Sequence, residues 1–181
     1  EYQPNSTLKR YKWESCRGIG RSFGYNRLET AEHYLTEKEL IFSFVDTISK
    51  NGNLLLNVGP TAEGKIPDLQ RDRLLALGKF VQRNQEGIYD TIPWQRATGE
   101  TKGNIEIRFT QKKDLLFVFL LGSPQKTEVT LKNLKFPPSS KISLLGTQEE
   151  IGWENQRENV KLHLAKVYPE FYSMGFKIKL R

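Results

Sequence analysis

Asn53-Leu-Leu-Leu-Asn-Val-Gly-Pro-Thr-Ala-Glu-Gly64 is the stretch that decides the fold of this 181-residue chain. Leu54 to Val58 shows no regular alternation of apolar and polar residues, which is typical of a strand covered on both faces in a parallel sheet. Gly59 and Pro60 then force the chain out of the strand. In α/β folds the loop after such a strand end is where chemistry is usually placed. The stretch therefore predicts a functional rim as well as a fold.

Two helices are expected on either side of this strand. The first opens with a capping box at Thr36–Glu39, continues with one apolar face and ends at Asn51-Gly52. The second opens at Pro67-Asp68 and closes at Gly87. Helix, strand and helix are a piece of a β/α repeat, in which parallel strands alternate with covering helices. One predicted parallel strand is too few for a complete barrel or doubly wound sheet.

The pattern changes at Pro93-Trp94, after which apolar and polar residues alternate with period two. Leu115–Leu121 is apolar throughout and is expected to be the central strand. Short strands separated by polar turns favour an antiparallel β-sandwich or a similar β domain. We therefore place a domain boundary near residue 95. The alternating segments are Ile105–Phe109, Val129–Leu131, Val160–Leu164 and Phe176–Leu180.

The net charge of +7 is distributed unevenly along the chain. Residues 1–95 carry 13 basic and 12 acidic side chains, whereas residues 96–181 carry 15 and 9. A basic half could meet nucleic acid, anionic glycans or anionic membranes. Its Lys and Arg residues alternate with apolar ones, however, which places them on solvated outer faces. No apolar run approaches the roughly 20 residues that span a bilayer. We expect neither nucleic acid nor a membrane as a partner.

Neither a metal nor another cofactor is expected. His33 and His163 have no further ligand at metal-binding spacing, and the single cysteine, Cys16, fits a packed thiol and excludes an intrachain disulfide. The glycine run Gly18–Gly24 lacks both the preceding strand and the Lys-Ser/Thr ending of a phosphate loop.

Two carboxylates stand out in the first 30 residues, which are polar, aromatic and irregular and are expected to form functional loops. Glycoside hydrolysis needs a pair of carboxyl groups beside the scissile bond, and aromatic rings suit the apolar face of a sugar. Glu1 and Glu14 are therefore candidates. A surface or structural ion pair is the alternative for each of them.

Four separated motifs occur in residues 1–94: Trp13-Glu-Ser-Cys16, Ser22-Phe-Gly-Tyr-Asn26, Lys50–Thr61 and Asn84–Trp94. In order and spacing they resemble the α-L-fucosidases of glycoside hydrolase family 29. The residues beyond 95 resemble that family's C-terminal domain, although less closely. The resemblance implies an α/β plus all-β fold. Residues 1–94 would be the C-terminal portion of the (β/α)8-type barrel, and residues 95–181 a C-terminal antiparallel β-sandwich.

The resemblance implies a retaining exo-hydrolase that removes terminal α-L-fucose from glycans by double displacement. Glu1 lies in the Glu-x-x-Pro context of that family's general acid/base and is our candidate for that role. Glu14 is expected to support the site and is the alternative acid. Phe23 is expected to pack against the C6 methyl side of the sugar. The edge of the pocket is assigned to Asn57, Gly59 and Thr61.

The family's nucleophilic Asp and most of its fucose pocket belong to earlier barrel strands, and nothing of them precedes Glu1. Asp46 and Asp68 are predicted on helices and do not replace that Asp. We therefore expect no fucosidase activity from these 181 residues alone. The resemblance favours a secreted, periplasmic or lysosomal location without fixing one, and a homo-oligomer is compatible with it.

A carbohydrate-binding module is the alternative from another class. In this interpretation the β half would bind a glycan, with Trp153 on an exposed loop as its platform, while the first half would be a non-catalytic remnant. Trp153 closing the core of the sandwich is the competing interpretation of the same residue.

Overall fold

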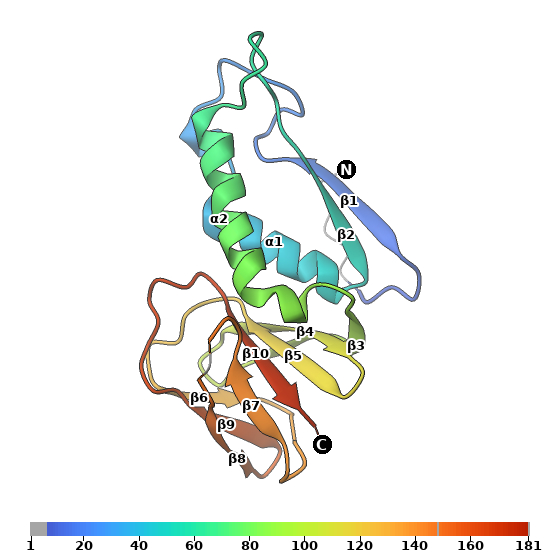
Figure 1. The fold of residues 1–181 in the computed structure, drawn as a ribbon, viewed down its shortest axis with the longest axis vertical. Helices are drawn as coiled ribbons and strands as arrows, with labels where there is room; N and C mark the ends of the chain where they lie inside the picture. Colours follow the sequence, from blue (N-terminus) through green and yellow to red (C-terminus); the bar gives the residue numbers. More distant parts are fainter. Residues whose placement is uncertain (1–6, 148, 181) are drawn as a thin grey trace. The chain divides into compact units, whose positions relative to one another are not determined.

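The computed structural model describes residues 7–147 and 149–180 of the chain and is drawn in Figure 1. Contacts between residues divide the chain into a first unit, Glu1–Gln82, and a second unit, Arg83–Arg181. The first unit is α/β and the second is all-β apart from its helical start, so the predicted fold class is confirmed.

The first unit is a two-stranded parallel sheet in which each strand is followed by a helix. The two strands are in register from the Trp13–Gly52 pair to the Gly18–Asn57 pair. The described strands of this unit therefore form an open sheet and close no barrel. The elements are β1 (Trp13–Gly18), the 3-10 helix η1 (Ala31–His33), α1 (Glu37–Ser49), β2 (Gly52–Asn57) and α2 (Asp68–Asn84), the last two residues of which belong to the second unit.

α1 begins and ends where the sequence predicts. The backbone N–H of Glu39 donates to the Thr36 hydroxyl at 3.2 Å, and the Glu39 carboxylate accepts from the Thr36 N–H at 2.8 Å. These two bonds satisfy donors that the first turn of a helix leaves unpaired. After Ser49 the chain turns at Asn51, whose φ of 73° is in the left-handed region that asparagine tolerates. The predicted capping box and helix end are confirmed.

β1 corrects the expectation that the first 30 residues are irregular. Trp13–Cys16 lies in a strand, and its neighbour is β2. The mixed polar and aromatic pattern hid this strand, because its two faces meet different surroundings. A Cβ on Gly52 would lie 2.6 Å from the Trp13 ring and 2.8 Å from the Thr47 side chain of α1, so the Trp13 face is the one that meets the helix.

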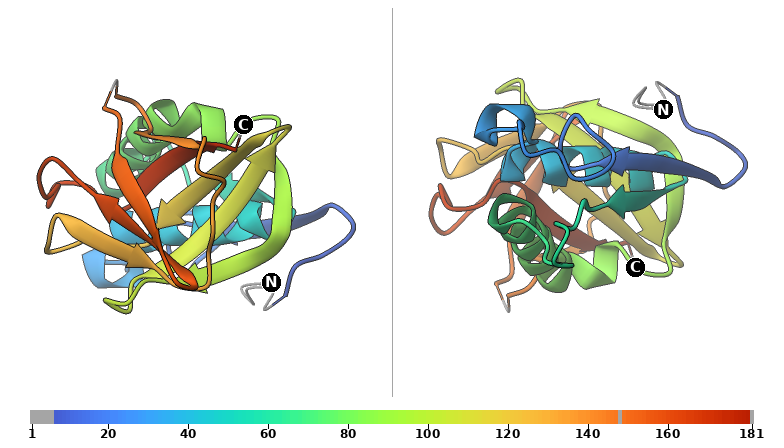
Figure 2. Two further views of the ribbon diagram at one scale, coloured as in Figure 1. Left: turned by 90° about the horizontal axis from the view of Figure 1, so that it is seen from below. Right: turned by 90° about the horizontal axis from the view of Figure 1, so that it is seen from above.

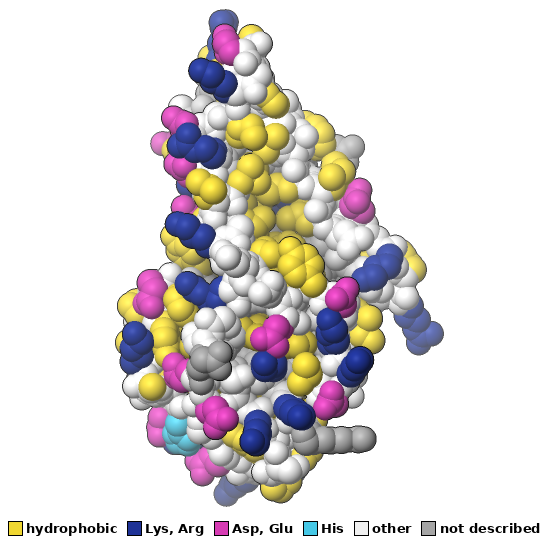
Figure 3. Space-filling model, viewed as in Figure 1, with side chains coloured by type: hydrophobic (Ala, Val, Ile, Leu, Met, Phe, Trp, Pro, Cys, Tyr) yellow, Lys and Arg dark blue, Asp and Glu magenta, His cyan; other side chains and the backbone are white. Residues whose placement is uncertain are grey.

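β2 is less covered than its sequence predicts. In-register neighbours share a face, so Glu14 and Cys16 lie with Asn53 and Leu55 on the face opposite α1. Leu55 is 51% exposed there, which contradicts the expectation of a strand buried on both faces. The reason is that this unit supplies a helical layer on one face only. Hydrophobic side chains gather on the first unit in Figure 3.

The second unit is an antiparallel sandwich that follows the 3-10 helix η2 (Gln85–Gly87) (Figure 2). One sheet has the order β3-β4-β5-β10-β7 and the other the order β6-β9-β8. All pairs of neighbouring strands are antiparallel. The strands are β3 (Ile92–Glu100), β4 (Glu106–Lys112), β5 (Leu115–Leu120), β6 (Glu128–Leu131), β7 (Lys141–Leu144), β8 (Gly152–Gln156), β9 (Asn159–His163) and β10 (Met174–Lys179).

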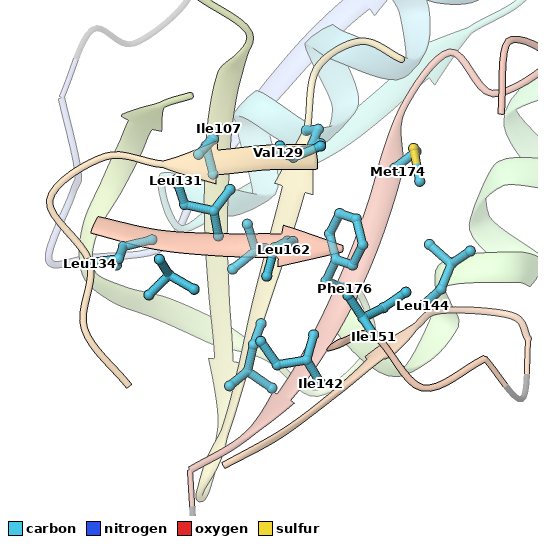
Figure 4. Close-up of a cluster of buried hydrophobic side chains, with 14 of the residues drawn as sticks. Ile107, Val129, Leu131, Leu134, Ile142, Leu144, Ile151, Leu162, Met174 and Phe176 are labelled. Atoms are coloured by element: carbon cyan, nitrogen blue, oxygen red, sulfur yellow. The ribbon is translucent and has the colours of Figure 1, made fainter. Parts of the chain in front are cut away.

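Side chains from both sheets meet in one hydrophobic core, which Figure 4 shows. β5 is central in its sheet, as predicted, and both of its faces are buried. Leu116, Val118 and Leu120 belong to the core between the sheets. Phe117 and Phe119 point the other way, where a Cβ on Gly87 would lie within 3.1 Å of their rings. The continuous apolar run therefore arises because η2 covers the outer face of this strand.

One expectation about the second unit is wrong, and one of the two interpretations of Trp153 is confirmed. Arg108 is only 8% exposed instead of solvated on an outer face, because its guanidinium pairs with Glu106 at 2.7 Å and donates to the Ile107 carbonyl at 3.0 Å. Trp153 lies in β8 and not on an exposed loop, which confirms the interpretation that it closes the core of the sandwich. Its ring packs edge-on against Phe136 at 5.8 Å between centroids, beside the core.

The division between the two units comes before the boundary expected near residue 95. Residues 83–91 belong with the sandwich, because the buried hydroxyl of Thr110 donates to the Gly87 carbonyl at 2.7 Å. Asn84, which is 1% exposed, lies directly against Gly175 in β10. The assignment of residues 1–94 and 95–181 to two domains stays a prediction.

We predict that Gly87→Ala destabilises the sandwich by about 1–3 kcal/mol, since the added methyl group would meet the Phe117 and Phe119 rings at 3.1 Å or less. Urea unfolding followed by the fluorescence of Trp94 and Trp153 measures this change. Gly103→Ala is the matched control, because its Cβ meets nothing closer than 3.8 Å. Equal unfolding midpoints for the two variants would contradict the close packing of Gly87.

Candidate active site

The candidate site lies at the carboxyl ends of β1 and β2. Because the two strands are parallel and in register, their last residues, Gly18 and Asn57, are neighbours. The loops that follow them, residues 19–36 and 58–67, therefore start at the same edge of the sheet. In β/α folds this edge carries the reactive groups.

Phe23 is displayed by the first of these loops. Its side chain is 48% exposed, and its carbonyl accepts a hydrogen bond from the Asn57 side-chain amide at the end of β2. Within the loop, the Asn26 side chain donates to the Ser22 hydroxyl at 3.0 Å, and the Glu29 carboxylate accepts from the Ser22 N–H. The aromatic ring is therefore open to solvent on a backbone that several bonds fix in place.

Gly59 allows the second loop to touch the first. A Cβ at this position would lie 2.5 Å from the carbonyl carbon of Gly24 and closer still to the Tyr25 nitrogen. Only glycine permits two backbones to approach so closely. The Gly59 N–H donates to the side-chain oxygen of Gln70 at 2.8 Å. The sequence predicted Gly59 as the end of a strand, and the structure adds this contact as a second reason for glycine.

Thr61 forms a tight turn farther along the second loop. Its N–H donates to the Lys65 carbonyl at 2.8 Å, and its carbonyl accepts from the Gly64 N–H at 2.9 Å. Gly64 has a φ of 76°, a conformation that favours glycine. Asn57, Gly59 and Thr61 thus lie in order along the end of β2 and the loop that follows it.

Of the two carboxylates singled out in the sequence, the structure describes Glu14. Glu1 lies outside the described residues. Glu14 is exposed on β1, four residues before Gly18, which corresponds to about 13 Å along a strand. The structure therefore separates Glu14 from Phe23 and Asn57, and places it beside Asn53 instead.

Gln70 is a site residue that the sequence analysis missed. It lies in the first turn of α2, is 4% exposed and contacts both loops, since its side-chain nitrogen is 3.5 Å from the Tyr34 hydroxyl. Its only sequence signal is a polar residue close to the apolar face of a predicted helix. That signal is weak, because most such residues are solvated.

A hollow of about 390 Å³ opens beside the first loop. Its buried part includes Ile19 and Tyr34, and charged side chains of both signs line it, among them Arg21 and Glu39. Hydrogen bonds from the backbone and hydroxyl of Thr36 lower the pKa of Glu39, so this carboxylate is tied to the start of α1.

The described parts of the chain contain neither a cluster of metal ligands nor a membrane-spanning helix. Residues 7–147 and 149–180 contain no group of three or more His, Cys, Asp and Glu side chains placed to hold a metal ion. None of the described helices is long and apolar enough to cross a bilayer. Cys16 is a free, half-buried thiol on β1.

Nearly the whole chain matches α-L-fucosidases, both in family models and in individual proteins. Residues 1–86 match the family model for α-L-fucosidase, and residues 100–181 match that for the α-L-fucosidase C-terminal domain. Tissue α-L-fucosidase of Mus musculus is 35% identical over 183 residues, which cover 100% of this chain and 40% of that protein. α-L-Fucosidase of Dictyostelium discoideum is also 35% identical, over 91% of this chain and 37% of that protein.

Solved structures give the same result. Thermotoga maritima α-fucosidase in complex with fucose superposes with a TM-score of 0.85 at 38% identity, covering 94% of this chain and 41% of that one. The same enzyme in complex with a mechanism-based inhibitor superposes with a TM-score of 0.87 at 37% identity, covering 99% of this chain and 41% of that one. The chain thus spans about two fifths of the length of these relatives. It belongs to the α-L-fucosidase family of glycoside hydrolases.

Proposed function

We propose that the chain is the C-terminal part of a retaining exo-α-L-fucosidase, which removes terminal α-L-fucose from glycans. The observation that carries this proposal is an exposed aromatic ring, Phe23, fixed by Asn57 at the carboxyl edge of two parallel strands in a chain of this family. The Thermotoga maritima relative has been crystallised with fucose, which supports fucose as the sugar.

The proposed reaction is a double displacement. An Asp carboxylate attacks the anomeric carbon and forms a glycosyl-enzyme, while a general acid protonates the departing oxygen. The same acid/base group then takes a proton from the water that releases fucose. In retaining enzymes the two carboxyl groups lie about 5–5.5 Å apart. We assign the acid/base role to Glu1 and place the nucleophile on a part of the protein upstream of Glu1.

The carboxylates Asp46 and Asp68 do not suit the role of nucleophile. Both lie on helices instead of at the carboxyl end of a strand. Asp46 pairs with Lys50 at 2.6 Å, and Asp68 pairs with Arg71 at 2.8 Å. Structural ion pairs account for both of them, which supports a nucleophile from another part of the protein.

Phe23 is proposed to bind the apolar side of fucose, where the C6 methyl group lies. The ring has half of its surface free for this contact, and aromatic faces suit the C–H surface of a sugar. Asn57, Gly59 and Thr61 would shape the edge of the same pocket. A single methyl group in an apolar pocket contributes about 1–3 kcal/mol of discrimination.

Glu14 is proposed as a support residue instead of the acid. Its place on β1, toward the amino end of the sheet, is the part of a β/α fold that serves stability. We expect its carboxylate to orient polar neighbours on the face that it shares with Asn53.

The proposed partner is a fucosylated glycan, and homo-oligomers are compatible with the proposal. Binding of nucleic acid finds little support, since Lys and Arg are interspersed with Asp and Glu on the face of the second unit in Figure 3. The alternative of a carbohydrate-binding module loses its platform, because the Trp153 ring packs on Phe136 and its N–H donates to the Ser140 carbonyl at 3.2 Å.

We predict that the purified 181-residue chain releases no nitrophenol from nitrophenyl α-L-fucoside, because it lacks the nucleophile. The assay compares it with a longer protein that contains this chain, at equal concentration. Turnover by the 181 residues alone, abolished by a fucosidase inhibitor, would show that they contain a complete site.

In that longer protein, Glu1→Gln is expected to slow hydrolysis of fucosides with poor leaving groups by about 10²–10⁴-fold, the usual contribution of acid catalysis. Nitrophenyl fucoside needs little protonation, so its first step should slow much less, and added azide should restore turnover by replacing water. Glu14→Gln is the matched control. Equal losses for good and poor leaving groups in Glu1→Gln, or the larger selective loss in Glu14→Gln, would overturn the assignment.

A further inference from the structure

We infer that Gln70 is a positioning residue that holds the two site loops together and thereby fixes Phe23. This inference rests on the proposed function where it concerns fucose, and on the structure alone where it concerns the loops. Gln70 lies on α2, outside both loops, and no substrate contact is assigned to it.

The side chain of Gln70 meets both loops at once. Its oxygen accepts from the Gly59 N–H at 2.8 Å, and its nitrogen is within 3.5 Å of the Tyr34 hydroxyl, which accepts from it. Gln70 and Tyr34 are 4% and 7% exposed. Buried bonds of this kind have no water to replace a lost partner, so their loss leaves polar groups unpaired.

Glutamine suits this position because its amide is both an acceptor and a donor. The Gly59 N–H lies just beyond Asn57, where β2 and its pairing with β1 end, and the Gln70 side chain accepts from it. A methionine has similar length but neither function. A glutamate keeps the acceptor for Gly59 and loses the donor to Tyr34.

Two contacts connect the segment around Gly59 with the backbone of Phe23 and its neighbours. The backbone of Gly59 touches that of Gly24 and Tyr25, directly after Phe23 in the chain. Two residues before Gly59, the Asn57 side chain donates to the Phe23 carbonyl. A shift of the Gly59 turn therefore displaces the backbone that carries the aromatic ring.

The expected consequence is a loss of selectivity for the C6 methyl group. Discrimination by a methyl pocket is usually about 10–200-fold in kcat/KM, and it depends on a wall that fits closely. A Phe23 ring that is free to shift would keep much of the binding to the rest of the sugar and lose this selectivity. A purely structural role of Gln70 would lower stability and leave the ratio unchanged.

The test uses a longer protein that contains this chain. Its substrates are nitrophenyl α-L-fucopyranoside and the corresponding pentopyranoside that lacks only the C6 methyl group. We expect Gln70→Met to lower the ratio of the two kcat/KM values about 5- to 10-fold, part of the usual methyl discrimination. Gln82→Met, at an exposed position of the same helix, is the matched control and should leave the ratio unchanged. Phe23→Ala is the positive control.

A second readout uses the 181-residue chain and needs no activity. Amide hydrogen exchange should become at least tenfold faster for residues 22–26 and 57–61 in Gln70→Met, which corresponds to about 1.4 kcal/mol. The rate should stay close to that of the unchanged chain in Gln82→Met. If Gln70→Met does not fold, Tyr34→Phe provides a second test, because it removes the bond between Gln70 and the first loop and keeps the bond to Gly59. Exchange of residues 22–26 should again become faster than in Gln82→Met, and an unchanged rate would overturn the inference.

The outcomes separate the inference from the proposed function. A changed ratio in Phe23→Ala but not in Gln70→Met, together with unchanged exchange, would overturn the role of Gln70 and leave the function intact. An unchanged ratio in Phe23→Ala, or no fucosidase activity in the longer protein, would count against the proposed function. Hydrogen exchange would then still decide whether Gln70 holds the loops.

Discussion

The parallel pairing of β1 with β2 is the constraint on which the candidate site depends. Parallel strands in register bring their carboxyl ends to one edge, so two loops that are far apart in the sequence start side by side. The Asn57–Phe23 hydrogen bond and the backbone contact of Gly59 with Gly24 are possible only at that edge. The same pairing places Glu14 beside Asn53, four residues before the edge.

In both units a glycine lets the backbone pack directly against another part of the same unit. Gly59 brings the second site loop against the first, and Gly87 brings η2 against the Phe117 and Phe119 rings of β5. In each case a short segment after a regular element is fixed by the absence of a side chain and by one buried hydrogen bond. The bond partners are Gln70 for Gly59 and Thr110 for Gly87. One close backbone contact and one buried hydrogen bond are therefore enough to fix each of these short segments.

Features that depend on neighbouring residues were predicted from the sequence, whereas features that depend on contacts between distant residues were missed. The capping box at Thr36 and the apolar run of β5 each depend on neighbouring residues and were found. β1 was missed because one of its faces meets α1 while the other carries Glu14 and Cys16. Gln70 was missed because its function is defined by two loops distant in the sequence. The exposure of Phe23 on a loop followed from the glycine-rich, aromatic composition of residues 18–26, whereas its contact with a sugar was inferred from the resemblance and stays a prediction.

The open face of β2 links the structure to the greater length of its relatives. Leu54–Leu56 has the composition of a strand covered on both faces, yet Leu55 keeps 51% of its surface exposed. Burying a whole leucine side chain is favourable by about 1.5–3 kcal/mol, so roughly half of that is not realised here. Relatives of this chain are about two and a half times as long, since it covers 40% of one of them. A layer over this face would have to come from outside the two described strands and the helices that follow them, since these cover only the opposite face.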